Sequence, residues 1–382
     1  MSLPFVVNNT AKTPLGRYRL LSPTASVRVS PLCLGAMNFG DAWKDYMGAC
    51  DQKNTEEILD FFYESGGNFI DTANNYQNEE SEKWIGEWMK KRGNRDQLVL
   101  ATKYTACFRP GRTDEITANY AGNSTKSLHV SVNASLRKLQ TDYLDLLYVH
   151  WWDYSTSIPE LMQSLNQLVA SGKVLYLGIS DTPAWVVSKA NEYARNHGLR
   201  PFSVYQGRWS AASRDFEREI LPMARDEGMA LAPWGALGGG AFKTEEQRQA
   251  QQGRASPASP EQVAISRVLE TVATRHDSLL TSVALAYVLH KSPYVFPIVG
   301  GRTVNHLRGN IEALRLRLSD DDIAEIEAAV PFDKGFPHNF LWTAKGNQHP
   351  QDTWLTSVGG VYDYVPMPKP ITIPDEPAAK AE

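Results

Sequence analysis

Short apolar runs alternate with longer runs of helical periodicity along most of this chain of 382 residues. Eight of the apolar runs have the length and composition of strands buried on both faces, at residues 31–35, 69–71, 99–103, 144–150, 174–179, 202–206, 229–233 and 295–299. Strands that alternate with helices predict a parallel sheet with the helices outside it, and eight repeats favour closure of that sheet into a barrel. The sequence therefore predicts an α/β fold, a single (β/α)8 TIM barrel.

The main rival to a barrel is a Rossmann fold, but no Gly-x-Gly-x-x-Gly fingerprint follows any of the strands. Two further runs at 17–21 and 27–30 precede the first barrel strand and predict an N-terminal β-hairpin. We therefore expect one domain with two flanking segments. These are an N-terminal tail at 1–14, the barrel at 15–336 and a C-terminal extension at 337–382.

Several helix starts carry cap signals. Asn54 with Glu57, and Ser157 with Glu160, have the spacing of a capping box. Such boxes predict helices that begin directly after residues 54 and 157.

The composition excludes several classes of protein. The net charge is −4, and the Lys and Arg residues are dispersed, which argues against a nucleic-acid or membrane-surface partner. Three cysteines are too few for a disulfide framework, and no spacing resembles a zinc site. The chain shows neither a secretory leader nor an apolar run of the ~20 residues that a membrane helix needs. A cytoplasmic protein without a metal is expected, and its oligomeric state is left open.

Three consecutive predicted strands end on titratable groups, namely Asp71, Lys103 and His150, and Tyr76 follows on the first loop. In a barrel these strand ends share one face, where active sites lie. The four groups suit proton donation to a carbonyl oxygen: the ammonium would lower the pKa of the Tyr76 phenol, and Asp71 would hold the ammonium in place. A neutral His150 could orient the carbonyl. Hydride would have to come from a cofactor, because no side chain can donate one.

These four residues resemble the catalytic tetrad of the aldo-keto reductases, and the likeness runs from about residue 16 to residue 336. Three segments resemble most closely the fungal aryl-alcohol dehydrogenase and norsolorinic acid reductase branch. They are Gly-Gly-Asn-Phe-Ile-Asp-Thr-Ala-Asn at 66–74, Gly-Ile-Ser-Asp-Thr-Pro-Ala-Trp at 178–185 and Phe-Pro-Ile-Val-Gly-Gly-Arg at 296–302. The resemblance implies an NADPH-dependent carbonyl reductase that also runs in reverse, with Tyr76 as proton donor assisted by Lys103, Asp71 and His150.

The resemblance also implies a set of cofactor contacts. Ser180, Asp181 and Gln206 match the positions that hold the nicotinamide carboxamide, although most of the superfamily has Asn in place of Asp181. Asp71 is expected to take part in the same contact region. The loop beside the pyrophosphate matches Trp234, Gly235, Ala236, Leu237, Gly238, Gly239 and Gly240. The adenosine end matches Gly301, Arg302, Thr303, His306 and Asn310, with Arg302 at a helix start paired to the 2′-phosphate.

Aromatic residues gather on the loops after strands, which suits an aryl aldehyde or a flat polycyclic ketone as the substrate. They are Trp43, Tyr46, Tyr104, Phe108, Trp151, Trp152 and Trp209. Of the residues on this face, Tyr46, His150 and Trp151 are predicted to contact the substrate. The alternative, from another class of function, is a barrel that binds NADPH as a sensor or regulatory subunit and has no significant turnover.

Overall fold

A computed structural model describes residues 10–250, 258–342 and 349–373. Most of the predicted N-terminal tail (residues 1–9) and parts of the predicted C-terminal extension (343–348 and 374–382) lie outside these described residues, as does segment 251–257. Within the described residues, eight parallel strands form one sheet. They are β3 (Cys33–Gly35), β4 (Phe69–Asp71), β5 (Val99–Tyr104), β6 (Leu144–Val149), β7 (Val174–Ser180), β8 (Val204–Arg208), β9 (Ala230–Trp234) and β10 (Ile298–Val299).

The sheet closes into a barrel. Its strands follow the order β10-β3-β4-β5-β6-β7-β8-β9, so each strand lies beside its neighbour in sequence and β10 returns to β3. At the remaining seam, the backbone amide of Phe296 donates to the carbonyl of Leu231 over 2.8 Å, and that of Leu231 to the carbonyl of Tyr294 over 2.9 Å. The predicted (β/α)8 barrel is confirmed.

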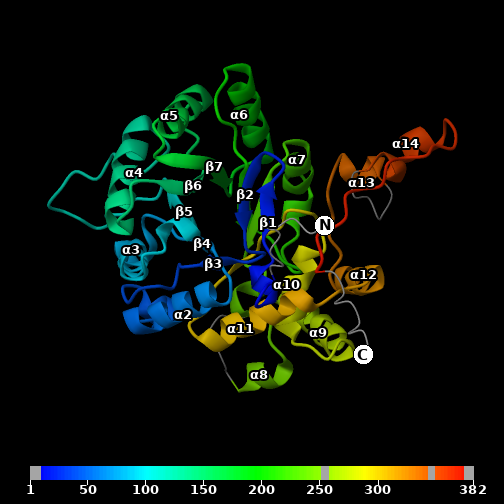
Figure 1. The fold of residues 1–382 in the computed structure, drawn as a ribbon. Coiled ribbons are helices and arrows are strands. Elements are labelled where there is room, and N and C mark those ends of the chain that lie inside the picture. The colour runs from blue at the N-terminus through cyan, green and yellow to red at the C-terminus, as the bar shows by residue number, and fades with distance from the viewer. Residues whose placement is uncertain (1–9, 251–257, 343–348, 374–382) are drawn as a thin grey trace, which may run out of the picture.

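Helices surround the barrel on its outside (Figure 1). In chain order they are α1 (Lys44–Met47), α2 (Gln52–Glu64), α3 (Glu80–Arg92), α4 (Thr125–Leu139), α5 (Ile158–Ala170), α6 (Ala184–Asn196), α7 (Ile220–Asp226), α8 (Glu245–Gln249), α9 (Pro260–Arg275), α10 (Leu280–Leu289), α11 (Val304–Glu312) and α12 (Asp320–Ala329). None of the helices in the described part of the chain combines the length and the apolar character that crossing a membrane requires.

The predicted N-terminal hairpin is present and closes one end of the barrel. Strands β1 (Arg19–Ser22) and β2 (Ala25–Val29) pair in an antiparallel manner. The hairpin lies in front of the barrel in Figure 1. Leu21 and Val29 belong to the same buried cluster as Phe69, Val99 and other side chains of the barrel strands. Because the hairpin covers the amino ends of the strands, access to the interior is from their carboxyl ends.

Neither predicted capping box forms as expected. Helix α2 begins three residues earlier than predicted, because Asp51 is the cap and accepts a hydrogen bond from the backbone amide of Asn54. Ser157 does cap α5 and accepts from the amide of Glu160, as predicted. The Glu160 carboxylate, however, accepts instead from the amide and hydroxyl of Thr125 on α4. The Glu160 side chain therefore joins α5 to α4 and does not bond back to Ser157, as a capping box would require.

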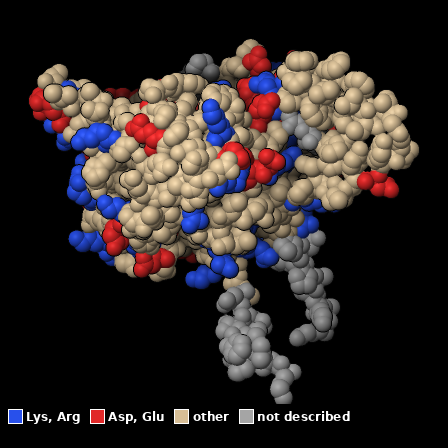
Figure 2. Space-filling model, turned by 90° about the horizontal axis from the view of Figure 1, so that it is seen from above, with Lys and Arg blue, Asp and Glu red and all other residues tan. Residues whose placement is uncertain are grey.

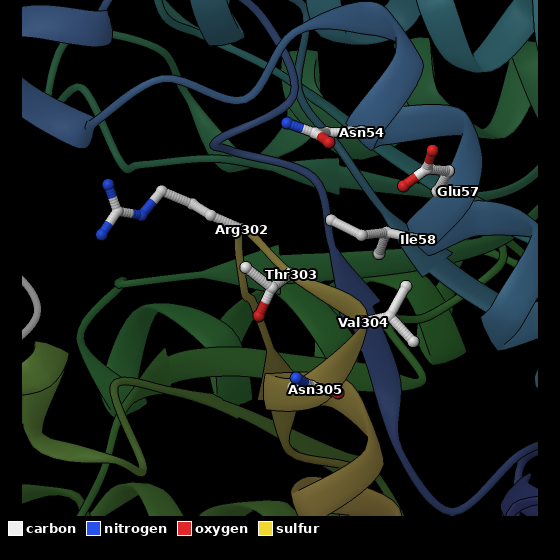
Figure 3. A pocket seen from close by; sticks show the side chains of 7 residues that line it. All are labelled: Asn54, Glu57, Ile58, Arg302, Thr303, Val304 and Asn305. Atoms are coloured by element: carbon white, nitrogen blue, oxygen red, sulfur yellow. The ribbon is translucent and has the colours of Figure 1, made fainter.

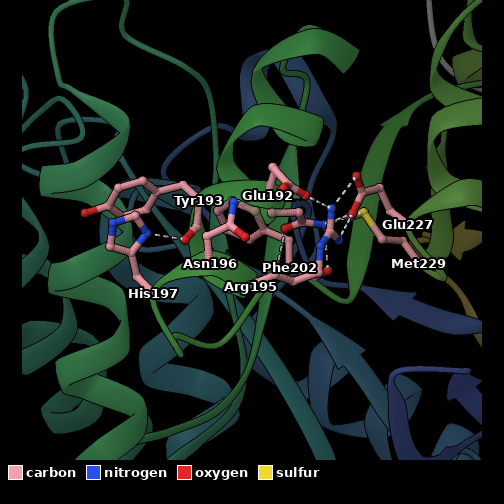
Figure 4. Close-up of polar contacts among 9 residues, drawn as sticks. Glu192, Tyr193, Arg195, Asn196, His197, Phe202, Glu227 and Met229 are labelled. Carbon is pink, nitrogen blue, oxygen red and sulfur yellow. Dashed lines mark hydrogen bonds and ion pairs between the residues drawn. The ribbon is translucent and has the colours of Figure 1, made fainter.

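A polar cluster on α6 fixes the chain that enters β8. The side chain of buried Asn191 accepts from the amide of Phe202 over 2.8 Å and donates to the carbonyl of the same residue over 3.3 Å. Its amide group also donates to Glu227, which pairs with Arg195 over 2.5 Å. Figure 4 shows Arg195 and Glu227 joined across this cluster.

Replacement of Asn191 by Ala should destabilise the fold by about 2–3 kcal/mol, because the buried amide and carbonyl of Phe202 lose their partners. Chemical denaturation with urea measures this difference. Asn196→Ala is the matched control, because that side chain is exposed on the same helix and, among the described residues, donates only to Glu192. The control should change the free energy of unfolding by less than about 0.5 kcal/mol. Equal losses in both variants would contradict the importance of the Phe202 contact.

The described part of the C-terminal extension projects from the side of the barrel near α7 (Figure 1). It contains α13 (His338–Leu341) and α14 (Trp354–Ser357). His338 contacts Glu219 beside the start of α7 over 2.6 Å. On the face shown in Figure 2, this lobe at the right carries few charged side chains, whereas blue and red side chains are interspersed over the barrel.

Candidate active site

The carboxyl ends of β4, β5 and β6 bring the predicted titratable groups together. Asp71 is the last residue of β4, Lys103 lies near the end of β5, and His150 directly follows β6. The three strands are neighbours in the sheet, and Lys103 pairs in register with Tyr148, two residues before His150. All three side chains are buried. Tyr76 is on the loop after β4 and completes the group.

The Lys103 ammonium lies at the centre of this group. It donates to the Asp71 carboxylate over 2.5 Å, to the backbone carbonyl of Thr72 over 2.8 Å and to the Tyr76 hydroxyl over 3.2 Å. The second oxygen of Asp71 accepts from the Gln206 amide over 2.9 Å. A buried ammonium thus has three acceptors and a buried carboxylate has two donors, as such charges require.

Electrostatics corrects one expectation from the sequence. Burial would lower the pKa of Lys103, but Asp71 and Tyr76 outweigh burial and raise it above its ordinary value, so the amine stays charged. Burial raises the pKa of Tyr76, and Lys103 only partly offsets this because Asp71 raises it again. The net direction for Tyr76 is upward, not downward as predicted. The phenol therefore keeps its proton at neutral pH, and Lys103 limits the rise.

His150 has the surroundings of a neutral imidazole. Burial, with the nearby charge of Lys103, holds its pKa well below the ordinary value. The ring stacks on Trp151 at 3.9 Å and meets the edge of the Tyr76 ring at 6.0 Å between centroids. Its buried Nδ1 atom has no hydrogen-bond partner among the described residues. A neutral ring next to Tyr76 can orient a carbonyl oxygen without adding a second positive charge.

The turn after Tyr76 contains a feature that the sequence did not reveal. Gln77, Asn78 and Glu79 all have left-handed backbone conformations, with φ values of +52°, +51° and +82°. Three such residues in succession are strained and need support from their surroundings. Lys138 of α4 supplies part of it, because its ammonium donates to the carbonyl of Asn74 over 3.0 Å and pairs with Glu79 over 3.1 Å. The position of Tyr76 thus depends on a helix far away in sequence.

Comparison of the sequence with known proteins identifies the family of this chain. The sequence profile of the aldo/keto reductase family matches residues 31–331, well over half of the chain. The chain belongs to the aldo-keto reductase family. It is therefore an oxidoreductase of a family that generally uses NADH or NADPH.

The branch resemblance is confirmed by relatives that align over almost their whole length. Norsolorinic acid reductase B of Dothistroma septosporum is 59% identical over 374 residues, with 95% of each chain covered. An aryl-alcohol dehydrogenase of Pestalotiopsis microspora is 54% identical, with 97% of this chain and 96% of the relative covered. A putative aryl-alcohol dehydrogenase of Saccharomyces cerevisiae is 55% identical over 340 residues.

In this aldo-keto reductase, the three residues matched to the carboxamide site lie on two neighbouring strands: Ser180 ends β7, Asp181 follows it, and Gln206 lies in the middle of β8. Ser180 pairs in register with Gln206, and the amide of Asp181 donates to the Gln206 carbonyl over 3.0 Å. The Ser180 hydroxyl is buried and has no partner among the described residues. The Asp181 carboxylate accepts from the indole of Trp234 over 3.1 Å and 3.2 Å to its two oxygens. Gln206 links this group to Asp71.

The two remaining segments matched to the cofactor follow β9 and β10, which meet at the seam of the barrel. Gly235, Gly238, Gly239 and Gly240 have φ values from +63° to +92°, a region that favours glycine. Between them, Ala236 is buried and Leu237 packs against the core. After β10, Gly301 and Arg302 precede Thr303, which caps α11 by accepting from the amide of His306. His306 is exposed, and Asn310 lies buried one turn further along α11.

The aromatic residues predicted on the loops divide into two groups. Trp43 meets the edge of Tyr76 at 6.3 Å, and Trp151, which is 42% exposed, stacks on His150. Tyr46 on α1 is 77% exposed. By contrast, Tyr104 and Trp209 are almost completely buried, and Trp209 stacks on Phe216. Tyr104 is the last residue of β5 and does not lie on a loop as predicted, and both side chains belong to the packed core and not to a pocket wall.

The neutral state of His150 predicts a dependence of stability on pH. Because its pKa is lowered in the folded state, the unfolded state binds more protons below pH ~6.5, and stability falls as the pH falls from there. The free energy of unfolding of the wild type should therefore fall more steeply than that of His150→Asn, by up to about 1.4 kcal/mol per pH unit. Urea denaturation across this range measures the two slopes. Parallel slopes would contradict a buried neutral imidazole.

Proposed function

We propose that this chain reduces aromatic aldehydes or ketones to alcohols with NADPH, reversibly, and that Tyr76 is the proton donor. The observation that carries the proposal is the position of the Tyr76 hydroxyl, 3.2 Å from a buried ammonium that is itself held by Asp71. A phenol beside a fixed cation can release its proton to a substrate oxygen, because the cation stabilises the phenolate that remains.

The roles of the side chains follow from their contacts. Tyr76 donates its proton to the carbonyl oxygen, and Lys103 stabilises the resulting phenolate from 3.2 Å. Asp71 and the Thr72 carbonyl hold the ammonium in place. His150, neutral and adjacent to Tyr76, hydrogen-bonds the same carbonyl oxygen and orients it. A bound nicotinamide cofactor supplies the hydride, which no side chain can provide.

The residues present fit such a cofactor. The buried Ser180 hydroxyl has no partner in the described part of the chain and is suited to bind an amide, and Gln206 is held beside it. Asp181 lies there too, although its carboxylate is engaged by Trp234. Positive-φ glycines after β9 allow backbone amides to approach a pyrophosphate. The start of α11 with Arg302 supports a preference for the 2′-phosphate of NADPH, and His306 and Asn310 would complete the adenosine end.

Two observations support an aromatic substrate: the aromatic side chains around the open carboxyl end of the barrel, and the names of the relatives. Trp43 contacts Tyr76, and Trp151 stacks on His150. The exposed Tyr46 lies on α1, which directly follows Trp43 in the chain. Flat aromatic faces of this kind suit a flat aromatic substrate. The names of the relatives, norsolorinic acid reductase and aryl-alcohol dehydrogenase, agree with a substrate of this class and with a place in secondary metabolism. We therefore infer contacts from Tyr46, His150 and Trp151 to the substrate.

Other expectations from the sequence form part of the same proposal. A cytoplasmic location is supported by three cysteines that are all free. The division into a tail at 1–14, a barrel at 15–336 and an extension at 337–382 stays a prediction.

Turnover assays with a substrate panel test the proposed function. The purified chain is mixed with NADPH and either substituted benzaldehydes or anthraquinone ketones, and loss of NADPH absorbance is followed. We expect oxidation of NADPH that depends on at least one aromatic carbonyl, and oxidation of the matching alcohol with NADP+. Tight NADPH binding without any turnover would favour the sensor instead.

A further inference from the structure

The loop between β3 and α2, residues 36–51, lies directly against Arg302. A Cβ atom added to Gly48 would be 1.9 Å from Nη1 of Arg302 and 2.8 Å from its Cζ. The Arg302 side chain thus runs through the space that any side chain at position 48 would fill. Gly48 also has a φ of +81°, a backbone conformation that favours glycine.

The amino-terminal half of this loop is anchored to the turn that carries Tyr76. The Gln77 side chain accepts from the amide of Trp43 over 2.7 Å and donates to the carbonyl of Met37 over 3.0 Å. The Glu80 carboxylate accepts from the amides of Asp41 and Ala42 over 2.7 Å and 3.0 Å. Four hydrogen bonds therefore fix the loop to one side of the active site.

The loop is also fixed to the segment that carries Arg302. The Asn38 side chain donates to the carbonyl of Gly301 over 2.7 Å, and Gly40 forms a bridge with Cys50, which returns the chain to the start of α2. Because the first half is tied down and Cys50 is bridged to it at Gly40, the loop has little freedom to withdraw if a side chain appears at position 48. The flexible Arg302 side chain would have to move instead.

The surroundings of Arg302 indicate what that movement would change. A cavity of about 240 Å³ lies between α2 and the start of α11, lined by Arg302, by Asn54, Glu57 and Ile58, and by 303–305. In Figure 3 the Arg302 guanidinium extends away from Asn54 and Glu57. No hydrogen bond or ion pair joins it to another residue within the described ranges, so its donors are available to an anion. Burial raises the pKa of the Cys50 thiol, and the charge of Arg302 opposes this rise, which agrees with a guanidinium directed toward the loop.

We propose that Gly48 determines the preference for NADPH over NADH, because it leaves the space in which the Arg302 guanidinium is held for the 2′-phosphate. The inference rests on the proposed function and deepens it. Gly48 acts only through Arg302 and is a positioning residue. A guanidinium displaced from its place loses the paired hydrogen bonds that it can offer to a phosphate, whereas NADH has no phosphate there to lose.

Binding of the two nucleotides to Gly48→Ala tests this proposal without any need for turnover. Titrations followed by nucleotide fluorescence give the Kd for NADPH and for NADH. The Kd for NADPH should rise about tenfold, the loss of roughly one charge-assisted contact, and the Kd for NADH should stay within about twofold. Gly172→Ala is the matched control, because Gly172 has a φ of +73° and nothing within 4 Å of an added Cβ. Like Gly48→Ala, it adds a Cβ atom at a positive φ, and it should leave both Kd values unchanged.

A double-mutant cycle tests whether Gly48 acts through Arg302. Arg302→Leu should bring the Kd for NADPH close to that for NADH, and Gly48→Ala should then have no further effect. If Gly48→Ala does not fold, recovery of folding in the Arg302→Leu background would show that the clash is with the guanidinium, and failure to fold there too would overturn the inference. Equal losses for both nucleotides, an unchanged NADPH Kd, or an added loss in the Arg302→Leu background would each overturn the inference. A wild type that binds neither nucleotide would instead overturn the proposed function, and this inference with it.

Discussion

Replacement of Tyr76 by Phe should lower kcat for reduction of an aromatic aldehyde by about 100- to 10,000-fold, the contribution expected of a positioned proton donor. The variant keeps the ring that meets Trp43 and His150 and removes only the hydroxyl next to Lys103. Affinity for NADPH should therefore be almost unchanged. Steady-state assays of NADPH consumption, with binding titrations alongside, measure both quantities.

Tyr63→Phe is the matched control for this variant. Its phenol is on α2 and donates to Gln97 on the surface, away from the strand ends. Loss of that hydroxyl should leave kcat unchanged. A Tyr76→Phe variant with wild-type turnover would remove Tyr76 from the reaction, whatever its distance from Lys103.

Replacement of Lys103 by Met should lower both the stability and the turnover of the protein. The buried Asp71 carboxylate would lose its 2.5 Å partner and keep the Gln206 amide, which leaves its charge without compensation in the barrel. Such losses destabilise a protein by about 3–5 kcal/mol. Denaturation with guanidinium chloride measures the stability, and NADPH consumption measures the loss of turnover.

A second variant separates the two roles of Lys103. In Lys103→Met combined with Asp71→Asn, the uncompensated charge is gone, so most of the stability should return. Turnover should stay low, because no cation remains next to Tyr76. Recovery of turnover in the double variant, or an unchanged stability in Lys103→Met, would contradict the role assigned to this ion pair.

The sequence was sufficient to predict the barrel and the meeting of four side chains, because parallel strands in a barrel end on one face. Asp71, Lys103 and His150 could be placed from strand boundaries alone, without any knowledge of distances. The direction of the Tyr76 pKa could not be predicted in the same way. It depends on how far burial and Asp71 outweigh Lys103, and these are properties of the packed structure.

Some residues hold the site from distant parts of the chain, and the sequence did not allow them to be recognised. Lys138 looks like an ordinary charge on a helix, yet it holds the turn after Tyr76. The positive φ values of Gln77, Asn78 and Glu79 could not be predicted from these residue types. Gly48 could have been interpreted as a turn residue, but its contact with Arg302 joins loops about 250 residues apart. Likewise, only burial distinguishes Trp209 in the core from Trp151 in the mouth.

The central claim is that the hydroxyl of Tyr76 gives its proton to the substrate as hydride is transferred. The most direct test is the single-turnover rate at which an excess of the chain, loaded with NADPH, reduces one aromatic aldehyde, in the wild type and in Tyr76→Phe. We expect a rate at least about 100-fold lower in the variant, at an NADPH affinity within about twofold of the wild type. Equal single-turnover rates, or a fall explained entirely by weaker NADPH binding, would contradict the claim.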